Sequence, residues 1–156
     1  MSDPFRFTAP MDGRLTPAMK SAYADAGVLV LENYLTKDET ARMRNATAAL
    51  VKEFDPETVR TVFSTEDQKH AADTYFRESG DKVRYFFEAE ALDETGTLVC
   101  GKTRALNKIG HALHDLDPDF AALSRLEKLE QTARDCGLSD PGLIQSMVIF
   151  KQPQIG

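Results

Sequence analysis

The chain has 156 residues, with 19 basic and 25 acidic side chains and a net charge of −6 when histidine is neutral. This length fits one domain, and a composition of 42% apolar and 28% charged residues is typical of a folded protein and too apolar for a disordered one. The acidic balance lacks the lysine and arginine clusters that bind nucleic acid or an anionic membrane surface. We therefore expect neither nucleic acid nor a membrane as a partner.

The cysteines and the N-terminus point to a cytoplasmic location. Cys100 and Cys136 are too few for a disulfide framework or a four-sulfur zinc site, so both are expected to be reduced. The first residues lack a basic stretch followed by an apolar run, and no apolar stretch approaches the ~20 residues that span a bilayer.

Residues 1–14 are expected to form an irregular N-terminal arm, because prolines and a glycine interrupt them without any periodicity. Residues 15–156 then form the N-terminal part of a single domain. The arm is not expected to take part in chemistry.

Two helices are predicted in the first third of the chain. Thr16 is suited to cap a helix over residues 17–26, which begins with proline, a residue that the first helical turn accepts. Thr36 and Glu39 have the spacing of a capping box ahead of a second helix over residues 37–53.

Apolar runs predict one partial β-sheet. Residues 28–31 form a short, largely β-branched run, and residues 82–88 alternate as a strand does. A turn at residues 93–96 lets residues 97–99 return as the hairpin partner. Residues 143–150 form a dense apolar strand, which leaves unpaired backbone groups unless another strand covers it.

Further helices are predicted between these strands. Residues 107–114 have the pattern of a short amphipathic helix, and another helix begins at Asp117 and Pro118 and ends near Gly137. Residues 55–80 are polar without clean periodicity, which predicts a long loop with helical turns. The fold class is therefore α+β.

The histidines are the first candidates for a metal ligand or a general base. His111 and His114 lie three apart on the predicted helix and share a face, so they form a small metal site if Asp115 or Asp117 adds an oxygen ligand. Packing or capping is the commoner role for such a pair, since it lacks the third ligand and the flanking glutamate of helical zinc motifs. His70 lies in a polar stretch and is expected at the surface.

Lys108 is the second candidate, because it interrupts an otherwise small and apolar stretch, residues 105–114. It is either an ordinary exposed lysine or a partly buried cation that holds a carboxylate ligand. The sequence contains no Gly-x-Ser-x-Gly elbow, no cysteine in an activated context and no glycine-rich phosphate loop.

Four segments resemble the phytanoyl-CoA dioxygenase family, and most closely its phytanoyl-CoA dioxygenase domain-containing branch. They are VLVLE at 28–32, SGDKVRYFFE at 79–88, LNKIGHALH at 106–114 and QSMVIFKQP at 145–153, and they run in the family's order. The resemblance implies a dioxygenase that depends on Fe(II) and 2-oxoglutarate, built on a double-stranded β-helix, or jelly roll. This chain would contribute the N-terminal helices and the first strands of that fold.

The resemblance also assigns residues. In the family, two histidines and one carboxylate hold the iron and leave positions open for 2-oxoglutarate and O₂. Two positions of this chain match 2-oxoglutarate contacts of the family, Lys108 and Met147. For Lys108 the chemistry agrees with a partly buried cation beside a dicarboxylate.

The iron ligands are where this sequence departs from the family pattern. The family's His-x-Asp motif begins a few residues beyond the Lys-Gln-Pro stretch, and no His-x-Asp occurs in this chain. His111 and His114 match the family's helix and not its triad, so we assign no catalytic residue and no metal ligand. The resemblance predicts the N-terminal half of an oxygenase, truncated before the iron site, inactive as it stands and binding 2-oxoglutarate weakly at most.

An alternative is a non-catalytic binding or assembly module. The exposed strand over residues 143–150 could pair with a separately encoded C-terminal half, or with its own copy, by strand addition.

Overall fold

In the computed structural model, which describes residues 3–58, 74–153 and 155, both N-terminal helices begin at the threonines predicted to cap them. The helix α1 (Pro17–Ala26) starts where the Thr16 side chain accepts a hydrogen bond from the Met19 amide. The helix α2 (Lys37–Glu53) starts at a complete capping box, since Thr36 and Glu39 each accept from the other's backbone N–H, at 3.1 and 2.7 Å. These two predictions are confirmed.

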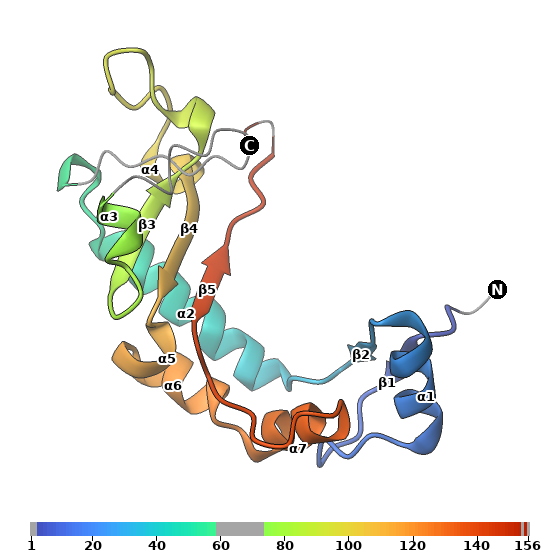
Figure 1. Cartoon of the computed structure of the whole chain (residues 1–156). Coiled ribbons are helices and arrows are strands. Elements are labelled where there is room, and N and C mark those ends of the chain that lie inside the picture. The colour runs from blue at the N-terminus through green and yellow to red at the C-terminus, as the bar shows by residue number, and fades with distance from the viewer. Residues whose placement is uncertain (1–2, 59–73, 154, 156) are drawn as a thin grey trace.

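The main sheet has three antiparallel strands in the order β3 (Val83–Phe87), β4 (Leu106–His111) and β5 (Ser146–Ile149), and α2 runs along one side of it (Figure 1). The predicted helix over residues 107–114 is therefore wrong, because most of it is the central strand. Pairing with strands on both sides gives the backbone hydrogen bonds that a helix would have formed internally, and Gly110 disfavours the helical alternative.

The predicted hairpin partner at residues 97–99 is also wrong, since β3 pairs with β4. The chain between these strands holds a turn in which the Asp93 carboxylate accepts the backbone N–H groups of Thr95 and Thr97. Its strand-like pairing is a single bridge between Leu92 and Leu98. Two short helical turns flank this loop, η3 (Ala89–Ala91) and α4 (Lys102–Ala105).

A second, parallel sheet joins β1 (Arg6–Thr8) to β2 (Val30–Glu32). The strand predicted over residues 28–31 thus exists with shifted bounds, but it does not belong to the main sheet. The stretch 1–14, expected to be irregular, supplies its partner strand. Figure 1 shows this small sheet and α1 beside α7, away from the main sheet.

The last predicted helix is divided into α6 (Pro118–Ser124) and α7 (Glu127–Asp135), after the short α5 (Leu113–Leu116). The chain leaves the helical conformation at Leu126, which has a ψ of 130°. The preceding side chain, Arg125, donates to the backbone carbonyl of His114 and to the Asp115 carboxylate, at 2.6 Å for the latter. This anchor holds the break, and side-chain spacing alone does not reveal it.

Helix α7 is attached to the N-terminal region. The Asp135 carboxylate accepts the Leu15 backbone N–H at 2.8 Å and the Lys20 ammonium at 2.6 Å. The Tyr34 hydroxyl donates a hydrogen bond of 2.7 Å to the Lys128 carbonyl oxygen.

The hydrophobic core lies between α2 and one face of the main sheet. The Phe54 ring stacks on the Tyr85 ring with centroids 4.1 Å apart. The largest apolar side chains of this core are Val51, Phe54, Phe87, Leu106, Ile109, Leu113 and Phe120. The mixture of helices and strands agrees with the predicted α+β class.

Two short segments come before the main sheet, η1 (Pro56–Thr58) and α3 (Thr74–Arg77). Most of the loop predicted over residues 55–80 lies outside the described residues, and so does His70. Within the ranges that the structure describes, no helix is both long and apolar enough to cross a membrane.

Candidate active-site face

The register of the main sheet divides its side chains between two faces. Tyr85, Ile109 and Val148 are aligned across the three strands and pack toward α2. The intervening residues lie on the opposite face, because side chains alternate along a strand and directly paired residues share a face. We call this second surface the Lys108 face, and it is formed by Arg84, Phe86, Lys108, Gly110, Met147 and Ile149.

Lys108 is buried on this face. The residue is only 5% exposed, and its ammonium nitrogen lies 5.0 and 5.2 Å from the ring centroids of Phe76 and Phe86. Burial lowers the pKa of Lys108 from 10.5 to about 8, because a low-dielectric environment disfavours the charged form. Of the two roles considered from the sequence, the structure supports the buried cation and not the exposed lysine.

Met147 lies on the same face, on the neighbouring strand. It pairs with Gly110, and Lys108 pairs with Ile149, so Met147 and Lys108 are diagonal neighbours. The missing side chain at Gly110 makes room for Met147, since an added Cβ would lie 2.8 Å from its Cγ. The structure thus brings together the two residues that were predicted to contact one ligand.

A covering segment, residues 74–79, packs over the Lys108 face. The rings of Tyr75 and Phe76 meet the Phe86 ring edge-on, with centroids 5.5 and 5.8 Å apart. The segment ends at Ser79, whose hydroxyl oxygen lies 2.7 Å from Nδ1 of His111. The rings of Phe76 and Phe86 therefore lie against the Lys108 ammonium.

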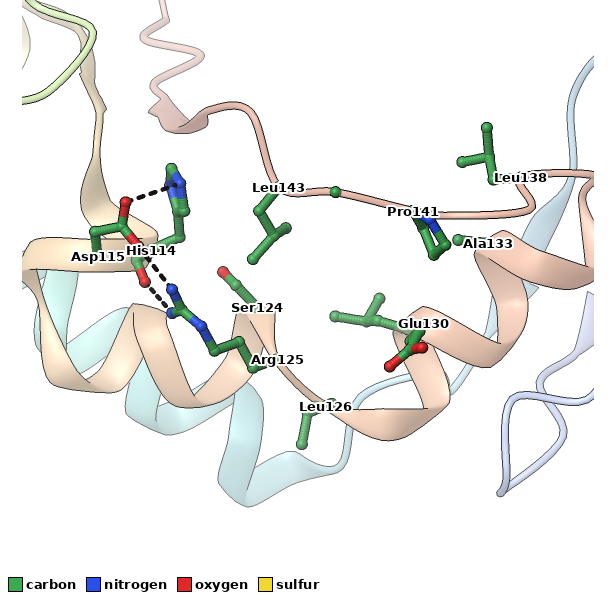
Figure 2. Close-up of a pocket in the computed structure, with 12 residues that line it drawn as sticks. His114, Asp115, Ser124, Arg125, Leu126, Glu130, Ala133, Leu138, Pro141 and Leu143 are labelled. Carbon is green, nitrogen blue, oxygen red and sulfur yellow. Dashed lines mark hydrogen bonds and ion pairs between the residues drawn. The ribbon is translucent and has the colours of Figure 1, made fainter.

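His114 belongs to a different place, a pocket of about 710 Å³ between α6, α7 and residues 138–143. Figure 2 shows the Asp115 carboxylate between the His114 imidazole and the Arg125 guanidinium, with Leu143 and Pro141 across the pocket. The Asp115 oxygens lie 3.4 Å from His114 Nε2 and 2.6 Å from Arg125 Nη2. These side chains contact one another and fix α5 against α6.

The two histidines do not converge on one point. His111 Nδ1 meets Ser79 at 2.7 Å, and His114 Nδ1 meets the Ser146 hydroxyl at 2.8 Å. The metal site considered from their spacing assumed a helix, but His111 ends a strand and His114 lies beyond it in α5. In residues 3–58, 74–153 and 155, no cluster of three or more histidine, cysteine, aspartate or glutamate side chains could hold a metal ion.

Comparison with known proteins identifies the family. The family model described as phytanoyl-CoA dioxygenase (PhyH) matches residues 23–156, which is most of the chain and includes the whole Lys108 face. The chain belongs to the phytanoyl-CoA dioxygenase family.

Individual members of this family are similar over nearly the whole chain. A phytanoyl-CoA dioxygenase domain-containing protein 1 homolog of Caenorhabditis elegans is 43% identical over 140 residues, covering 88% of this chain and 49% of the relative. A phytanoyl-CoA dioxygenase of Arabidopsis thaliana is 40% identical, covering 92% and 50%. A phytanoyl-CoA dioxygenase domain-containing protein 1 of Bos taurus is also 40% identical, covering 91% and 50%. The chain therefore spans about half the length of the curated relatives it matches.

Sequence reasoning within the family pattern found Lys108 and Met147 but missed the residues that surround them. Gly110, Phe76 and Ser79 were assigned no role at the site, and His111 was considered only beside His114. Residues 106–111 are buried on both faces, so they lack the two-residue alternation of a half-buried strand. The same six residues also fit a helix, and the sequence alone did not decide between the two.

Proposed function

We propose that this chain supplies the 2-oxoglutarate-binding face of an Fe(II)- and 2-oxoglutarate-dependent dioxygenase with a double-stranded β-helix fold. The observation that carries the proposal is the buried ammonium of Lys108 on the same sheet face as Met147. Membership of the family supports it independently.

Lys108 would bind one carboxylate of 2-oxoglutarate through a charge-assisted hydrogen bond. The ammonium is buried against the Phe76 and Phe86 rings, where its attraction to a carboxylate would be stronger than in water. Binding of an anion favours the protonated lysine and raises its pKa above about 8. Met147 would supply an apolar contact to the carbon chain, at the position that Gly110 leaves open.

In a complete enzyme of this kind, iron would activate O₂, and one oxygen atom would enter the substrate as a hydroxyl group while the other enters succinate as 2-oxoglutarate loses CO₂. The residues present here do not fit the iron. The sequence has no His-x-Asp, and the part of the chain that the structure describes has no suitable ligand cluster. We therefore propose that the iron ligands belong to a C-terminal portion, and that this chain alone binds the co-substrate weakly and does not turn it over.

Titration of the 156-residue chain with 2-oxoglutarate, followed by NMR of lysine labelled at Cε, tests this function. We expect the Lys108 resonance to shift and its pKa to rise, and we expect Lys108→Met to abolish binding. Lys37→Met, which removes an exposed lysine at the start of α2, is the matched control and should bind normally.

The same samples, supplied with Fe(II) and ascorbate, should release no succinate. Succinate release by this chain would contradict the proposal that it lacks the iron site. An unperturbed Lys108 at saturating 2-oxoglutarate would contradict its role as the ligand's cation.

A second candidate function is assembly through β5. Within the described residues β5 forms its ladder with β4 alone and lies at the edge of the sheet, and Ile144 and Ile149 are 89% and 53% exposed. We propose that this edge pairs with a separate C-terminal half or with a second copy. Sedimentation of the purified chain should then show a concentration-dependent dimer that Ile149→Lys disrupts, and a monomer at all concentrations would exclude self-pairing.

A further inference from the structure

The hydrogen bonds of Ser79 define the protonation of His111. The Ser79 hydroxyl lies 2.5 Å from the Phe76 carbonyl oxygen, which can only accept, so the hydroxyl proton is directed there. The same hydroxyl oxygen lies 2.7 Å from His111 Nδ1 and must accept from it. His111 is therefore the Nδ1–H tautomer, and Nε2 carries the lone pair of the neutral ring.

This pair is buried together with Lys108. Ser79 is 1% exposed and His111 is 6% exposed. The His111 ring contacts two aromatic rings, with centroids 5.7 Å from Phe76 and 5.6 Å from Phe86. These are the same two rings that surround the Lys108 ammonium.

The pair connects β4 to the covering segment. His111 ends β4, Ser79 ends the segment 74–79, and the Ser79 hydroxyl also holds the carbonyl of Phe76. On the other side of the segment, Arg84 of β3 donates to the Tyr75 carbonyl and lies over the Tyr75 ring. The segment that carries the Phe76 ring is thus held to β4 by the imidazole hydrogen bond of His111 and to β3 by Arg84.

We propose that His111 is a positioning residue for the ligand-binding lysine: through Ser79 it holds the Phe76 ring over Lys108 and keeps the ammonium buried. The ligand in this inference comes from the proposed function, whereas the contacts of His111, Ser79 and Phe76 do not depend on that function. In this role His111 binds neither metal nor substrate. It acts by its Nδ1–H donor.

The charged groups near His111 allow its positioning role to be distinguished from a direct electrostatic effect on the pKa of Lys108. Besides Lys108, the charged side chains in or beside the covering segment include Arg77, Glu78, Lys82 and Arg84. Arg84 pairs with Glu78 at 3.7 Å, and the Lys82 ammonium donates to the Glu78 carbonyl oxygen. Burial and the charge of Lys108 lower the pKa of His111 below its usual 6.5. His111 is therefore neutral where Lys108 titrates, so a change in the Lys108 pKa on replacing His111 reports burial and not a lost charge.

The test measures the Lys108 pKa without ligand, by NMR of lysine labelled at Cε, with Lys108→Met to assign the resonance. We expect a pKa of about 8 in the native chain. Ser79→Ala and His111→Phe should raise it toward 10.5 as the covering segment loosens and water reaches the ammonium. His111→Asn should retain a low pKa, because the asparagine amide can donate to Ser79 from the position of Nδ1.

His114→Phe is the matched control. His114 is also buried and also meets a serine through Nδ1, at 2.8 Å, but it contacts neither Phe76 nor Phe86 in the described structure. It should leave the Lys108 pKa unchanged. Unchanged values in Ser79→Ala and His111→Phe, or equal shifts in Asn and Phe variants at position 111, would overturn the positioning role.

A measurement on the native chain keeps the inference testable if a variant fails to fold. Imidazole ¹⁵N spectra near pH 7.5 should show His111 protonated at Nδ1 and unprotonated at Nε2, and the opposite tautomer would overturn it. A different result is expected if the positioning role is right and the proposed function is wrong. The Lys108 pKa then responds to Ser79→Ala, while 2-oxoglutarate does not shift the lysine resonance.

Discussion

Gly13 lies directly against the backbone of Lys128, where an added Cβ would stand 2.1 Å from the Lys128 carbonyl oxygen. Its φ of +75° is in the left-handed region that side chains disfavour. The contact is continued by Thr132, whose hydroxyl lies 2.9 Å from the Gly13 carbonyl oxygen. A glycine in the N-terminal arm therefore sets how closely the arm approaches α7.

Gly13→Ala should destabilise the fold more than the same substitution at a glycine that also has a positive φ but has open space around it. The backbone conformation alone costs about 1–2 kcal/mol, and the clash with backbone atoms adds to it. Gly27→Ala is the control, since its φ is +69° but nothing lies within 4 Å of an added Cβ. Urea unfolding followed by circular dichroism checks this, and equal losses at the two positions would contradict the close contact.

Glu39 should give the chain part of its acid sensitivity. Its pKa is lowered from 4.5, first by the hydrogen bond from the Thr36 backbone and then by Lys128, whose ammonium lies 3.0 Å from its carboxylate. A lowered pKa means that this stabilisation is complete above pH 4.5 and is lost as the pH falls through the native value. Glu39→Gln keeps an acceptor for the cap but should flatten the decline in stability below pH 4.5.

Lys128→Met should flatten the same decline in part, because it removes the second cause of the lowered pKa. The measurement is the free energy of unfolding at several pH values between 3 and 7. An identical pH dependence in the native chain and in Glu39→Gln would show that another carboxylate is responsible.

Lys108 should make the chain more stable in mild alkali. Its pKa is about 8 in the folded state and 10.5 in the unfolded state, so the unfolded chain binds more protons between these values. Stability therefore rises with pH from about 8 to 10.5. Lys108→Met should remove this rise and should be more stable than the native chain at pH 7, whereas Lys37→Met should retain the rise.

Gly110→Ala should disturb Met147 specifically. The added Cβ would lie 2.8 Å from Met147 Cγ and 3.3 Å from the Ser146 carbonyl oxygen, and overpacking of this kind typically costs about 1–3 kcal/mol. Because the closest atom belongs to a flexible side chain, Met147→Ala in the same chain should recover most of the loss. A double-mutant cycle on unfolding measures the coupling, and strict additivity would contradict the contact.

Local signals in the sequence were sufficient for the two N-terminal helices. Thr16, Thr36 and Glu39 are caps that act within four residues, so no distant part of the chain is needed to interpret them. The resemblance to the family likewise identified Lys108 and Met147, which the structure places on one face. What failed was the choice between helix and strand for the residues around Lys108.

That failure has a physical cause. Residues 106–111 are almost entirely buried, and a segment buried on both faces loses the alternation that marks a strand. Its partner strands are distant in the sequence: the paired residues Val83 and His111 are 28 positions apart, and Lys108 and Ile149 are 41 apart. Likewise the break at Leu126 follows from Arg125 reaching back to His114, a contact that side-chain periodicity does not encode.

Because the N-terminal region is attached to α7, we expect these two parts to open locally together and separately from the main sheet. The Val30 N–H donates to the Phe5 carbonyl oxygen in the N-terminal region, whereas the N–H groups of β4 lie in the ladders of the main sheet. Amide hydrogens of β2 should therefore exchange with deuterium in step with those of α7, and sooner than those of β4. A change at Asp135 would then speed exchange throughout the first 32 residues while leaving the protection around Lys108 intact.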